Sequence, residues 1–492
     1  MRVDTPEWVR DAVFYQIFPD RFARSARMTP IGPYEAWDAP PTTDGIKGGD
    51  LYGVVDRLGE LAELGINALY LTPVFSSASN HRYHAYDYLA VDPILGGDAA
   101  LRELLDQAHE RGMRVILDGV FNHCGRGFWP FHHVLELGAD SPYRDWFYLD
   151  PAVREGTVKL NAYPDRGGIS GGTGLGYRAW WGLPALPKLN TDNPATREYL
   201  LGVGEHWLRF GIDGWRLDVP AEIDDRAFWA EFRRRCRAVN PEAYLVGEIW
   251  DQAPEWVEGD RFDALMNYPL GTAILGFVGG DHLDLTVIAH HDSYRRMIQR
   301  LDGPGFARRL ESLMTAYDPA VVAVQLNLIG SHDTPRALTV LGADRAALGL
   351  AIILLATLPG APCIYYGDEI AMAGDHDPDN RRAYPVDPTA GDQSMRALVR
   401  AVMTARHDHA ALRRGSLVVL SAAGGALAYL LEADGQRAIV AINAGPAPAA
   451  LAVPRADDRS YRQLELPGMA TGSWVEGTIA LPPQGAVVLV GA

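Results

Sequence analysis

The segment RVILDGVFNH at residues 114–123 joins a short apolar, β-branched run to a polar end that holds Asp118, Asn122 and His123. Such a run is typical of a buried strand. Seven further runs of this kind occur along the chain, and a longer segment with helical periodicity follows each of them. The other runs are AVFYQIF (12–18), INALYLTPVF (66–75), IDGWRLDV (212–219), AYLVGEIW (243–250), FDALMNY (262–268), VAVQLNLIGSH (322–332) and APCIYYGDEI (361–370). Eight strand–helix units in series predict an α/β fold, a (β/α)8 TIM barrel with its active site at the carboxyl ends of the strands.

One connection between the predicted strands is much longer than the others. Between His123 and the run that begins at Ile212 there is room for far more than one helix, which predicts a small subdomain inserted after strand 3, at residues 124–188. After about residue 415 short alternating runs separated by Gly, Pro and Asp predict an all-β C-terminal domain, a β-sandwich at residues 416–492. The barrel then takes residues 1–123 and 189–415.

Three helices and one loop are also predicted from local patterns. Segments 98–111 and 196–210 carry apolar residues on one face, which is typical of amphipathic helices. The apolar run 346–358 predicts a buried helix, because a helix that crosses a bilayer needs roughly 20 residues. The segment GGISGGTGLG (167–176) follows no strand and precedes no Lys-Ser/Thr pair, so we expect a mobile loop rather than a phosphate cradle.

Composition narrows the class of partner. Lys and Arg number 45 against 62 Asp and Glu, and the formal charge of -17 disfavours nucleic acid and anionic membranes as partners. The 12 Trp and 21 Tyr suit a neutral polyhydroxylated ligand, because aromatic faces stack on sugar rings. The three cysteines have neither zinc-binding nor disulfide-framework spacing. The first residues show no signal peptide, so we expect a cytoplasmic protein.

Charged and histidine residues close several of the predicted strands, and all of them would face the same mouth of the barrel. Arg216 and Asp218 lie two apart in one strand and therefore share a face. The guanidinium should keep Asp218 ionised. Burial and like charges should raise the pKa of Glu248, which suits a proton donor. The residues at the strand ends are Asp118, Asn122, His123, Arg216, Asp218, Glu248, His332 and Asp333.

This arrangement matches the needs of glycoside cleavage, in which one carboxylate attacks the sugar carbon and one acid protonates the leaving oxygen. A third carboxylate, Asp333, would bind ring hydroxyls and stabilise positive charge on the sugar. A single acid at a strand end is more often a helix cap or an ion-pair partner, but several strands that end in such groups are far less often a coincidence. Zinc is disfavoured, because the histidines at these strand ends form no His-x-x-x-His pair.

The motifs at these strand ends resemble the four signature stretches of the α-amylase family of glycoside hydrolases (family 13). They are DGVFNH (118–123), GWRLDVP (214–220), GEIW (247–250) and IGSHDT (329–334), with further similarity in YQIFPDRF (15–22), GGDLYG (48–53) and SNHRYHAYDY (79–88). The resemblance implies that Asp218 is the nucleophile, Glu248 the general acid/base and Asp333 the transition-state stabiliser of a retaining enzyme that cleaves α-glucosidic bonds. It implies that the substrate is bound by His81, Tyr83, His123, Arg216, His332, Asp118 and Trp250, with Tyr83 as the stacking platform.

Two stretches, LPKLN (186–190) and VNPEAYLVGEIW (239–250), resemble the neopullulanase, cyclomaltodextrinase and maltogenic amylase branch of the family. Members of that branch usually carry an extra N-terminal β domain, whereas the first strand here is predicted near residue 12, which leaves the oligomeric state open. No cofactor is expected, and no metal ligand is assigned. Calcium is left open. The first loop ARSARMTP (23–30) has no acidic ligand. In many α-amylases a second calcium site uses the Asn that matches Asn122 and a His, and this chain has Glu222 at the position of that His.

The sequence thus predicts a retaining α-glucan hydrolase that cleaves α-1,4 bonds of cyclodextrins, maltooligosaccharides, pullulan or starch, with transglycosylation. A dedicated 4-α-glucanotransferase on the same scaffold is the alternative, and a non-catalytic glycan-binding relative is a more distant one. Tyr15, Trp180, Trp181 and Trp250 are further candidates for sugar platforms, with packing in the core as the competing interpretation for each.

Overall fold

Eight short strands form a parallel sheet at the centre of the computed structural model, which describes residues 3–160, 174–387, 389–453, 460–475 and 477–491. Their order is β8-β7-β6-β5-β2-β1-β10-β9, and a parallel bridge between Met266 and Leu326 joins the two outer strands and closes the barrel. The strands are β1 (Phe14–Ile17), β2 (Ala68–Leu71), β5 (Arg114–Gly119), β6 (Gly214–Leu217), β7 (Tyr244–Gly247), β8 (Ala264–Leu265), β9 (Leu326–Leu328) and β10 (Ala361–Tyr365). Each lies inside one of the eight runs, and the predicted TIM barrel is confirmed.

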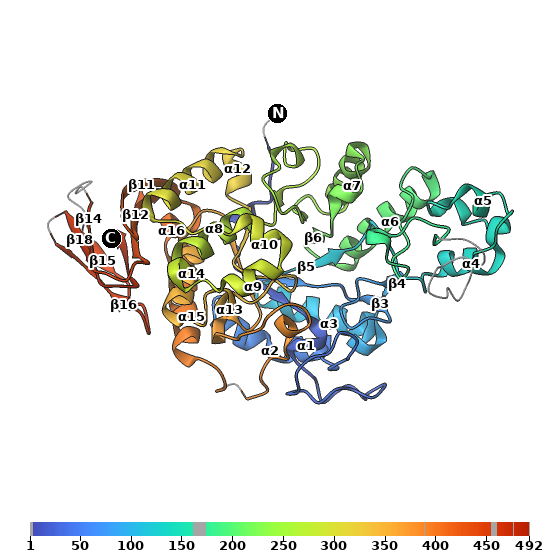
Figure 1. The fold of residues 1–492 in the computed structure, drawn as a ribbon, viewed down its shortest axis with the longest axis horizontal. Coiled ribbons are helices and arrows are strands. Elements are labelled where there is room, and N and C mark those ends of the chain that lie inside the picture. Colours follow the sequence, from blue (N-terminus) through green and yellow to red (C-terminus); the bar gives the residue numbers. More distant parts are fainter. Residues whose placement is uncertain (1–2, 161–173, 388, 454–459, 476, 492) are drawn as a thin grey trace.

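Helices surround the barrel (Figure 1). The longer ones are α2 (Leu51–Glu63), α3 (Gly97–Glu110), α6 (Pro194–Phe210), α7 (Arg226–Val239), α8 (Tyr268–Gly279), α11 (Gly303–Thr315), α14 (Arg345–Thr357) and α15 (Gln393–Asp408). The shorter ones are α1 (Pro19–Phe22), α9 (Leu285–His290), α10 (Asp292–Met297), α12 (Pro319–Val322), α13 (Ala337–Val340) and α16 (Ala410–Arg414). The three predicted helices are α3, α6 and α14, with ends displaced by one or two residues.

Helix α6 begins earlier than predicted because its first turn is capped. The side chain of Asn193 accepts from the backbone N–H groups of Ala195 and Thr196, and Pro194 occupies the first helical position, where its missing N–H costs nothing. Helix α14 is buried over nearly its whole length, as its uniformly apolar sequence predicts. No described helix is both long and apolar enough to cross a membrane.

Two irregular segments lie beyond the carboxyl ends of the strands. An antiparallel pair, β3 (Phe75–Ser77) and β4 (Ala85–Val91), follows β2. Between β5 and α6 the chain forms α4 (Trp129–Leu137), α5 (Pro151–Arg154) and short 3-10 turns, which is the predicted insertion after strand 3 (Figure 1, teal). Its two ends are joined by a bridge between His123 and Lys188. Most of the predicted mobile loop, residues 167–173, lies outside the described residues.

The described residues after 415 are all β, as predicted, and they form two sheets that share one apolar core. The first sheet runs β11-β12-β13-β19-β15 with β16 beside β19, and the second runs β14-β18-β17. The strands are β11 (Ser416–Ala423), β12 (Ala426–Ala433), β13 (Gln436–Asn443), β14 (Ala449–Ala452), β15 (Tyr461–Gln463), β16 (Ala470–Thr471), β17 (Ser473–Val475), β18 (Thr478–Leu481) and β19 (Gly485–Gly491). The domain boundaries drawn from the sequence stay predictions.

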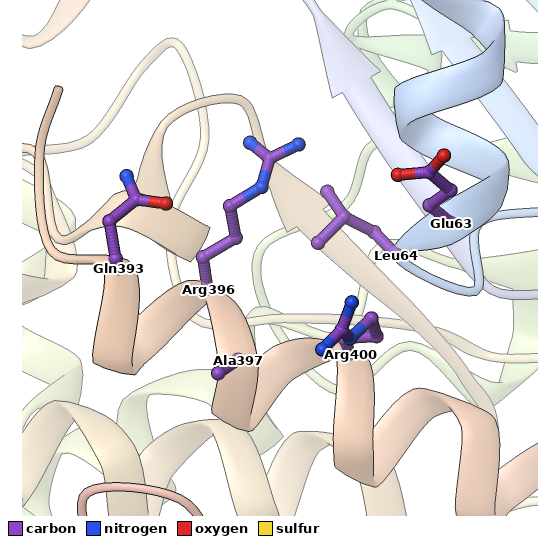
Figure 2. A pocket seen from close by; sticks show the side chains of 6 residues that line it. All are labelled: Glu63, Leu64, Gln393, Arg396, Ala397 and Arg400. Carbon is purple, nitrogen blue, oxygen red and sulfur yellow. The ribbon is translucent and has the colours of Figure 1, made fainter. Parts of the chain in front are cut away.

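Two features of the fold lie apart from the strand ends. The three cysteines are buried and unpaired, in agreement with the absence of a disulfide framework. A surface pocket between α2 and α15 is lined by Glu63, Leu64, Gln393, Arg396, Ala397 and Arg400 (Figure 2). None of the candidate residues at the strand ends contributes to this pocket, so it is separate from the site described next.

Candidate active site

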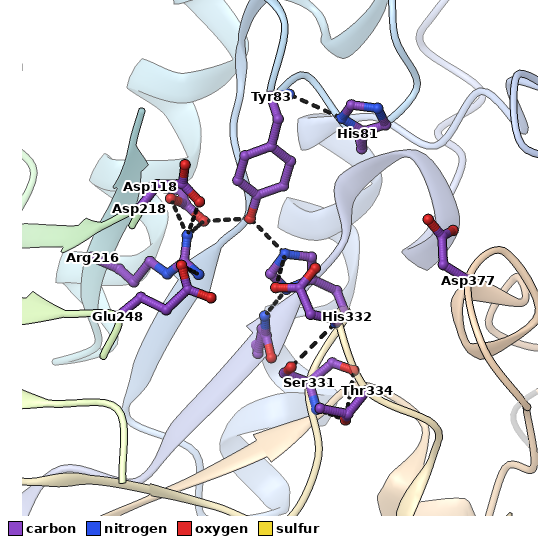
Figure 3. A network of polar contacts seen from close by, with 12 residues as sticks. His81, Tyr83, Asp118, Arg216, Asp218, Glu248, Ser331, His332, Thr334 and Asp377 are labelled. Carbon is purple, nitrogen blue, oxygen red and sulfur yellow. Dashed lines mark hydrogen bonds and ion pairs between the residues drawn. The ribbon is translucent and has the colours of Figure 1, made fainter. Parts of the chain in front are cut away.

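The candidate residues meet at the carboxyl ends of the barrel strands (Figure 3). Asp118 lies in β5 and Arg216 in β6, while Asp218 and Glu248 are the first residues after β6 and β7. The backbone N–H of Asp218 still bonds to the carbonyl of Gly119, at 3.0 Å, so the sheet register holds the residue in place. His332 and Asp333 follow β9, and His81 and Tyr83 lie between β3 and β4.

Arg216 is the centre of the cluster. Its side chain is fully buried, and one guanidinium nitrogen lies 2.8 and 3.0 Å from the two carboxylate oxygens of Asp118 and 3.0 Å from Oδ1 of Asp218. The other terminal nitrogen lies 2.9 Å from Oε2 of Glu248. One cation thus faces three buried carboxyl groups, which cannot all be ionised without a net negative charge in a site of low polarity.

Burial raises the pKa of Glu248 to about 7, against the opposing effect of Arg216 and with a further increase from the charge of Asp333. The predicted proton donor therefore has the raised pKa that the sequence argument expected. For Asp218, which was expected to stay ionised, two effects on the pKa oppose each other. Burial raises the pKa of Asp218 well above its usual range, although Arg216 lowers it. The sequence argument counted the neighbouring guanidinium and left out the cost of removing the carboxylate from water.

A chain of hydrogen bonds connects Tyr83, His332 and Asp118. The amide Nε2 of Gln16 donates to Nδ1 of His332 at 2.8 Å, so the proton of the neutral ring lies on Nε2. Nε2 of His332 lies 2.6 Å from the hydroxyl oxygen of Tyr83 and 3.0 Å from Oδ2 of Asp333. The Tyr83 hydroxyl in turn donates to Oδ2 of Asp118 at 2.8 Å. Burial lowers the pKa of His332 well below its usual range, which agrees with a neutral ring.

Two histidines line the same mouth on the side of the β3–β4 segment and the inserted subdomain. Nδ1 of His81 accepts from the backbone N–H of Tyr83 at 3.1 Å, and burial lowers its pKa well below the usual range. His123 is fully buried, and its Nε2 has no hydrogen-bond partner within the part of the chain that the structure describes. The ring lies near the backbone carbonyl of Tyr83, which raises its pKa slightly, but burial dominates and lowers it to about 3.

Trp250 stands beside the proposed acid. Its ring stacks on Tyr268 with centroids 3.7 Å apart and planes 6° apart, and its Nε1 lies 3.3 Å from Oε1 of Glu248, to which it donates. One face of the indole is therefore occupied by Tyr268, and its polar edge is turned to the carboxylate.

The other aromatic candidates divide into one core residue and one exposed stack. Tyr15 is fully buried, and its hydroxyl donates to Glu369 at 3.0 Å, so Tyr15 packs the core and is not a sugar platform. Trp180 stacks on His123 at 4.8 Å, and Trp181 stacks on Trp180 at 4.3 Å. Trp181 is 78% exposed and has a φ of 52°, which is strained for a residue with a Cβ.

Several residues at the site were missed by sequence reasoning. Gln16 orients His332 from the middle of β1, and Tyr70 in β2 donates to Asp118 at 2.8 Å. Both lie in predicted strands, and side chains alternate between the two faces of a strand. That alternation could have placed both residues in the barrel interior. Arg381 donates through Nε to the carbonyl of His332 at 2.8 Å and lies 3.4 Å from Oδ1 of Asp333. It comes from an irregular segment 48 residues after Asp333, which no local pattern connects to the site.

The residues compared with a calcium site in many α-amylases, Asn122 and Glu222, are both bonded to a lysine. Lys188 Nζ donates to Oδ1 of Asn122 at 2.6 Å and to the carbonyl of Glu222 at 2.7 Å. The described part of the chain contains no cluster of three or more His, Cys, Asp or Glu side chains that could hold a metal ion. Beside Asn122 and Glu222 the ammonium group of Lys188 thus supplies the positive charge that a calcium ion would bring.

Comparisons with known proteins agree with this geometry. The model of the α-amylase catalytic domain matches residues 16–416. A cyclomaltodextrinase of Geobacillus thermopakistaniensis is 42% identical over 426 residues, which cover 86% of this chain and 67% of that protein. Neopullulanase 2 of Thermoactinomyces vulgaris is 41% identical over 416 residues, which cover 84% of this chain and 65% of that protein. This chain therefore spans about two thirds of the length of both relatives.

Among solved structures, the native form of the debranching enzyme of Nostoc punctiforme is 42% identical, with a TM-score of 0.89 and complete coverage of both chains. Both the sequence match and the structural match extend over the barrel, where the carboxylates lie. The chain therefore belongs to the α-amylase family of glycoside hydrolases.

Proposed function

We propose that the protein is a retaining α-glucan hydrolase that cleaves α-1,4-glucosidic bonds of cyclodextrins, maltooligosaccharides, pullulan or starch and also transfers glycosyl units. The observation that carries the proposal is the pair of buried carboxyl groups, Asp218 and Glu248, on one guanidinium at the barrel mouth. Oδ2 of Asp218 is buried and bonded to no other described residue, so it is free to attack. A glycosidase needs one carboxylate to attack and one acid to donate, and retaining enzymes form a covalent intermediate on the first.

In the first step Asp218 attacks the anomeric carbon of the bound sugar while Glu248 gives its proton to the glycosidic oxygen. The pKa of about 7 leaves Glu248 partly protonated near neutral pH, as this step requires. The leaving sugar departs with the proton, and a glycosyl ester remains on Asp218. Asp333 stabilises the positive charge that develops on the ring in the transition state.

In the second step Glu248, now ionised, takes a proton from a water molecule that attacks the anomeric carbon and releases Asp218. A sugar hydroxyl in place of water gives transglycosylation by the same chemistry. Arg216 keeps the carboxylates in place and supplies the charge that favours ionised Asp218. His81, Tyr83, His123 and His332 bind the sugar at the point of cleavage, with the ring of Tyr83 as its platform.

The relatives support the substrate class. Proteins named cyclomaltodextrinase and neopullulanase 2 are about two-fifths identical to this chain. A second candidate is cleavage of α-1,6 bonds, because one of the solved structures that match this chain over its whole length is that of a debranching enzyme. A dedicated 4-α-glucanotransferase uses the same carboxylates and differs in how the acceptor side excludes water.

A substrate panel separates these candidates. Incubation with γ-cyclodextrin, pullulan, maltotriose and an α-1,6-branched dextrin, with product lengths and reducing ends followed over time, should show new reducing ends from α-1,4 substrates. Cleavage confined to the branched dextrin would establish the debranching function. Redistribution of chain lengths without new reducing ends would establish the transferase.

The role of Asp218 is tested by Asp218→Asn, which removes the nucleophile and keeps the shape of the side chain. We expect turnover to fall by a factor of about 10⁴ or more, while a maltooligosaccharide still binds with similar affinity. Undiminished turnover in this variant would rule out the mechanism. Binding without turnover in the unmodified protein would instead identify a non-catalytic glycan-binding relative.

We also infer that the protein works in the cytoplasm. Its three cysteines are all unpaired and buried, which is common in reducing compartments. Fractionation of the source cells with an antibody against the protein would test this location, and recovery in the culture medium would refute it.

A further inference from the structure

Lys188 is a buried ammonium group that the mechanism above does not use. Its side chain is only 6% exposed, and it comes from the end of the inserted subdomain, where His123 and Lys188 pair across a β-bridge. Its Nζ donates to the side-chain oxygen of Asn122 and to the main-chain oxygen of Glu222. These two residues follow β5 and β6, so Lys188 connects two loops at the mouth of the barrel.

The ammonium group decides which way the Asn122 amide points. An ammonium can only donate, so the amide atom at 2.6 Å from Nζ must be the oxygen. The amide nitrogen therefore faces His123 and lies 3.2 Å from its Nδ1. An amide nitrogen can only donate in turn, so Nδ1 of His123 accepts and carries no proton. Both Asn122 and His123 are fully buried, so water does not compete for these bonds.

The proton of the neutral His123 ring is then on Nε2. That atom is buried and forms no hydrogen bond to the described residues. The ring lies beside the backbone carbonyl of Tyr83, which raises the pKa of His123 against the larger effect of burial, and Tyr83 is also the platform of the proposed sugar site. A buried donor without a partner costs free energy unless a ligand accepts from it. A sugar hydroxyl oxygen would be such an acceptor.

We propose that Lys188 is a positioning residue: through Asn122 it holds His123 in the tautomer that carries its proton on Nε2 and donates to a hydroxyl of the bound sugar. This inference rests on the proposed function for the identity of the ligand, but the tautomer itself does not depend on that function. Lys188 touches none of the reacting atoms, and it fixes the tautomer of His123 through the Asn122 amide.

A double-mutant cycle tests the relay. Lys188→Met removes the ammonium and keeps an unbranched apolar chain. His123→Gln places an amide donor near the position of Nε2 that needs no particular tautomer. We expect Lys188→Met to lower kcat/KM for γ-cyclodextrin by about 10- to 100-fold, and by less than about twofold in the His123→Gln background. Equal effects in both backgrounds would show that Lys188 serves the fold in general and would overturn the proposal.

Asn122→Asp is a second variant that keeps the charge contact. The carboxylate still accepts from Lys188, which favours folding, but it can only accept from His123 and so forces the proton onto Nδ1. We expect a loss of kcat/KM at least as large as that of Lys188→Met, with Tm retained. Unchanged kcat/KM in this variant would refute the relay. Lys159→Met is the matched control, because Lys159 is an exposed lysine of the same inserted segment and its loss should change neither quantity.

A spectroscopic readout separates failure of the relay from failure of the proposed function. Long-range proton–nitrogen correlation spectra of ¹⁵N-histidine-labelled protein distinguish the two tautomers, and the signal of His123 is identified by its loss in His123→Gln. We expect a proton on Nε2 in the unmodified protein, on Nδ1 in Asn122→Asp, and a mixture in Lys188→Met. A proton on Nδ1 in the unmodified protein would overturn the inference. An unmodified protein that shows the expected tautomer but cleaves no glucan would refute the proposed function alone.

Discussion

The hydrogen bond from Trp250 to Glu248 makes the pH dependence of the enzyme testable by one substitution. The acid must be protonated to act, so kcat/KM should fall above the pKa of Glu248, which burial raises to about 7. The N–H of Trp250 lies 3.3 Å from Oε1 and stabilises the ionised carboxylate. Trp250→Phe removes this donor and leaves an aromatic ring to stack on Tyr268. The pKa of Glu248 should therefore rise, and the basic limb should move to higher pH.

The size of the displacement follows from the geometry. A hydrogen bond to a charged group contributes about 1.5–3 kcal/mol, and at 3.3 Å the contribution lies at or below the lower end of that range. Since one pKa unit corresponds to about 1.4 kcal/mol, the limb should move up by about 0.5–1 unit. At pH 8 the protonated fraction of Glu248 then rises about three- to fivefold relative to the unmodified protein.

The assay measures kcat/KM for γ-cyclodextrin between pH 5 and 9. The fitted quantity is the pH at which kcat/KM falls on the basic side, and the maximum value of kcat/KM is not used. Trp256→Phe is the matched control, since Trp256 packs against Phe262, with ring centroids 5.7 Å apart, and against Arg261, away from Glu248. Its limb should stay in place. A limb that stays in place or moves to lower pH in Trp250→Phe would refute the assignment of this titration to Glu248.

Three further substitutions and one treatment with EDTA probe the site and the residues that support it. Tyr83→Phe keeps the ring but loses the hydroxyl that donates to Asp118, so kcat/KM should fall about tenfold, whereas Tyr83→Ala should lose about a thousandfold or more because the platform itself is gone; equal losses would argue against stacking. Burial raises the pKa of Asp368 from 3.8 to about 7, so the folded protein binds its proton more tightly than the unfolded chain does and loses stability as pH rises between these values, by about 4 kcal/mol at most. Asp368→Asn cannot titrate, and the difference in Tm between pH 5 and pH 8 should shrink; an unchanged difference would contradict the burial argument. Because the ammonium group of Lys188 bonds to Asn122 and Glu222, EDTA should leave Tm and kcat/KM unchanged, and a fall of several degrees in Tm would show a bound metal ion.

Local patterns predicted the barrel because each strand lies within a short apolar run and each long helix carries its own periodicity. The run 114–123 contains β5 and also the polar end that faces the mouth. The ends of the elements were less accurate, as at α6, where the cap formed by Asn193 moves the first turn. Tyr15 was wrongly considered as a platform because its strand register, which turns it toward Glu369, is set by neighbouring strands and not by its own segment.

The residues that hold the candidate site together were the least predictable. Arg381 and Gln16 both orient His332, yet they lie 49 residues after it and 316 residues before it. Lys188 stands 66 residues from Asn122 and contacts it only because the inserted subdomain returns to the barrel. Spacing in the sequence carries no information about such contacts when no repeat or motif connects the two segments.

The sequence by itself determined the chemistry that is available: which carboxyl, histidine and aromatic groups stand at the strand ends, and that consecutive parallel strands must bring those ends to one side. Only the tertiary structure decided the state of these groups. Burial raises the pKa of Asp218 that an adjacent arginine was expected to lower, and Lys188 orients Asn122 and through it His123. The reason is physical: ionisation and tautomer depend on desolvation and on hydrogen-bond partners, and both arise only when segments distant in the chain enclose the same space.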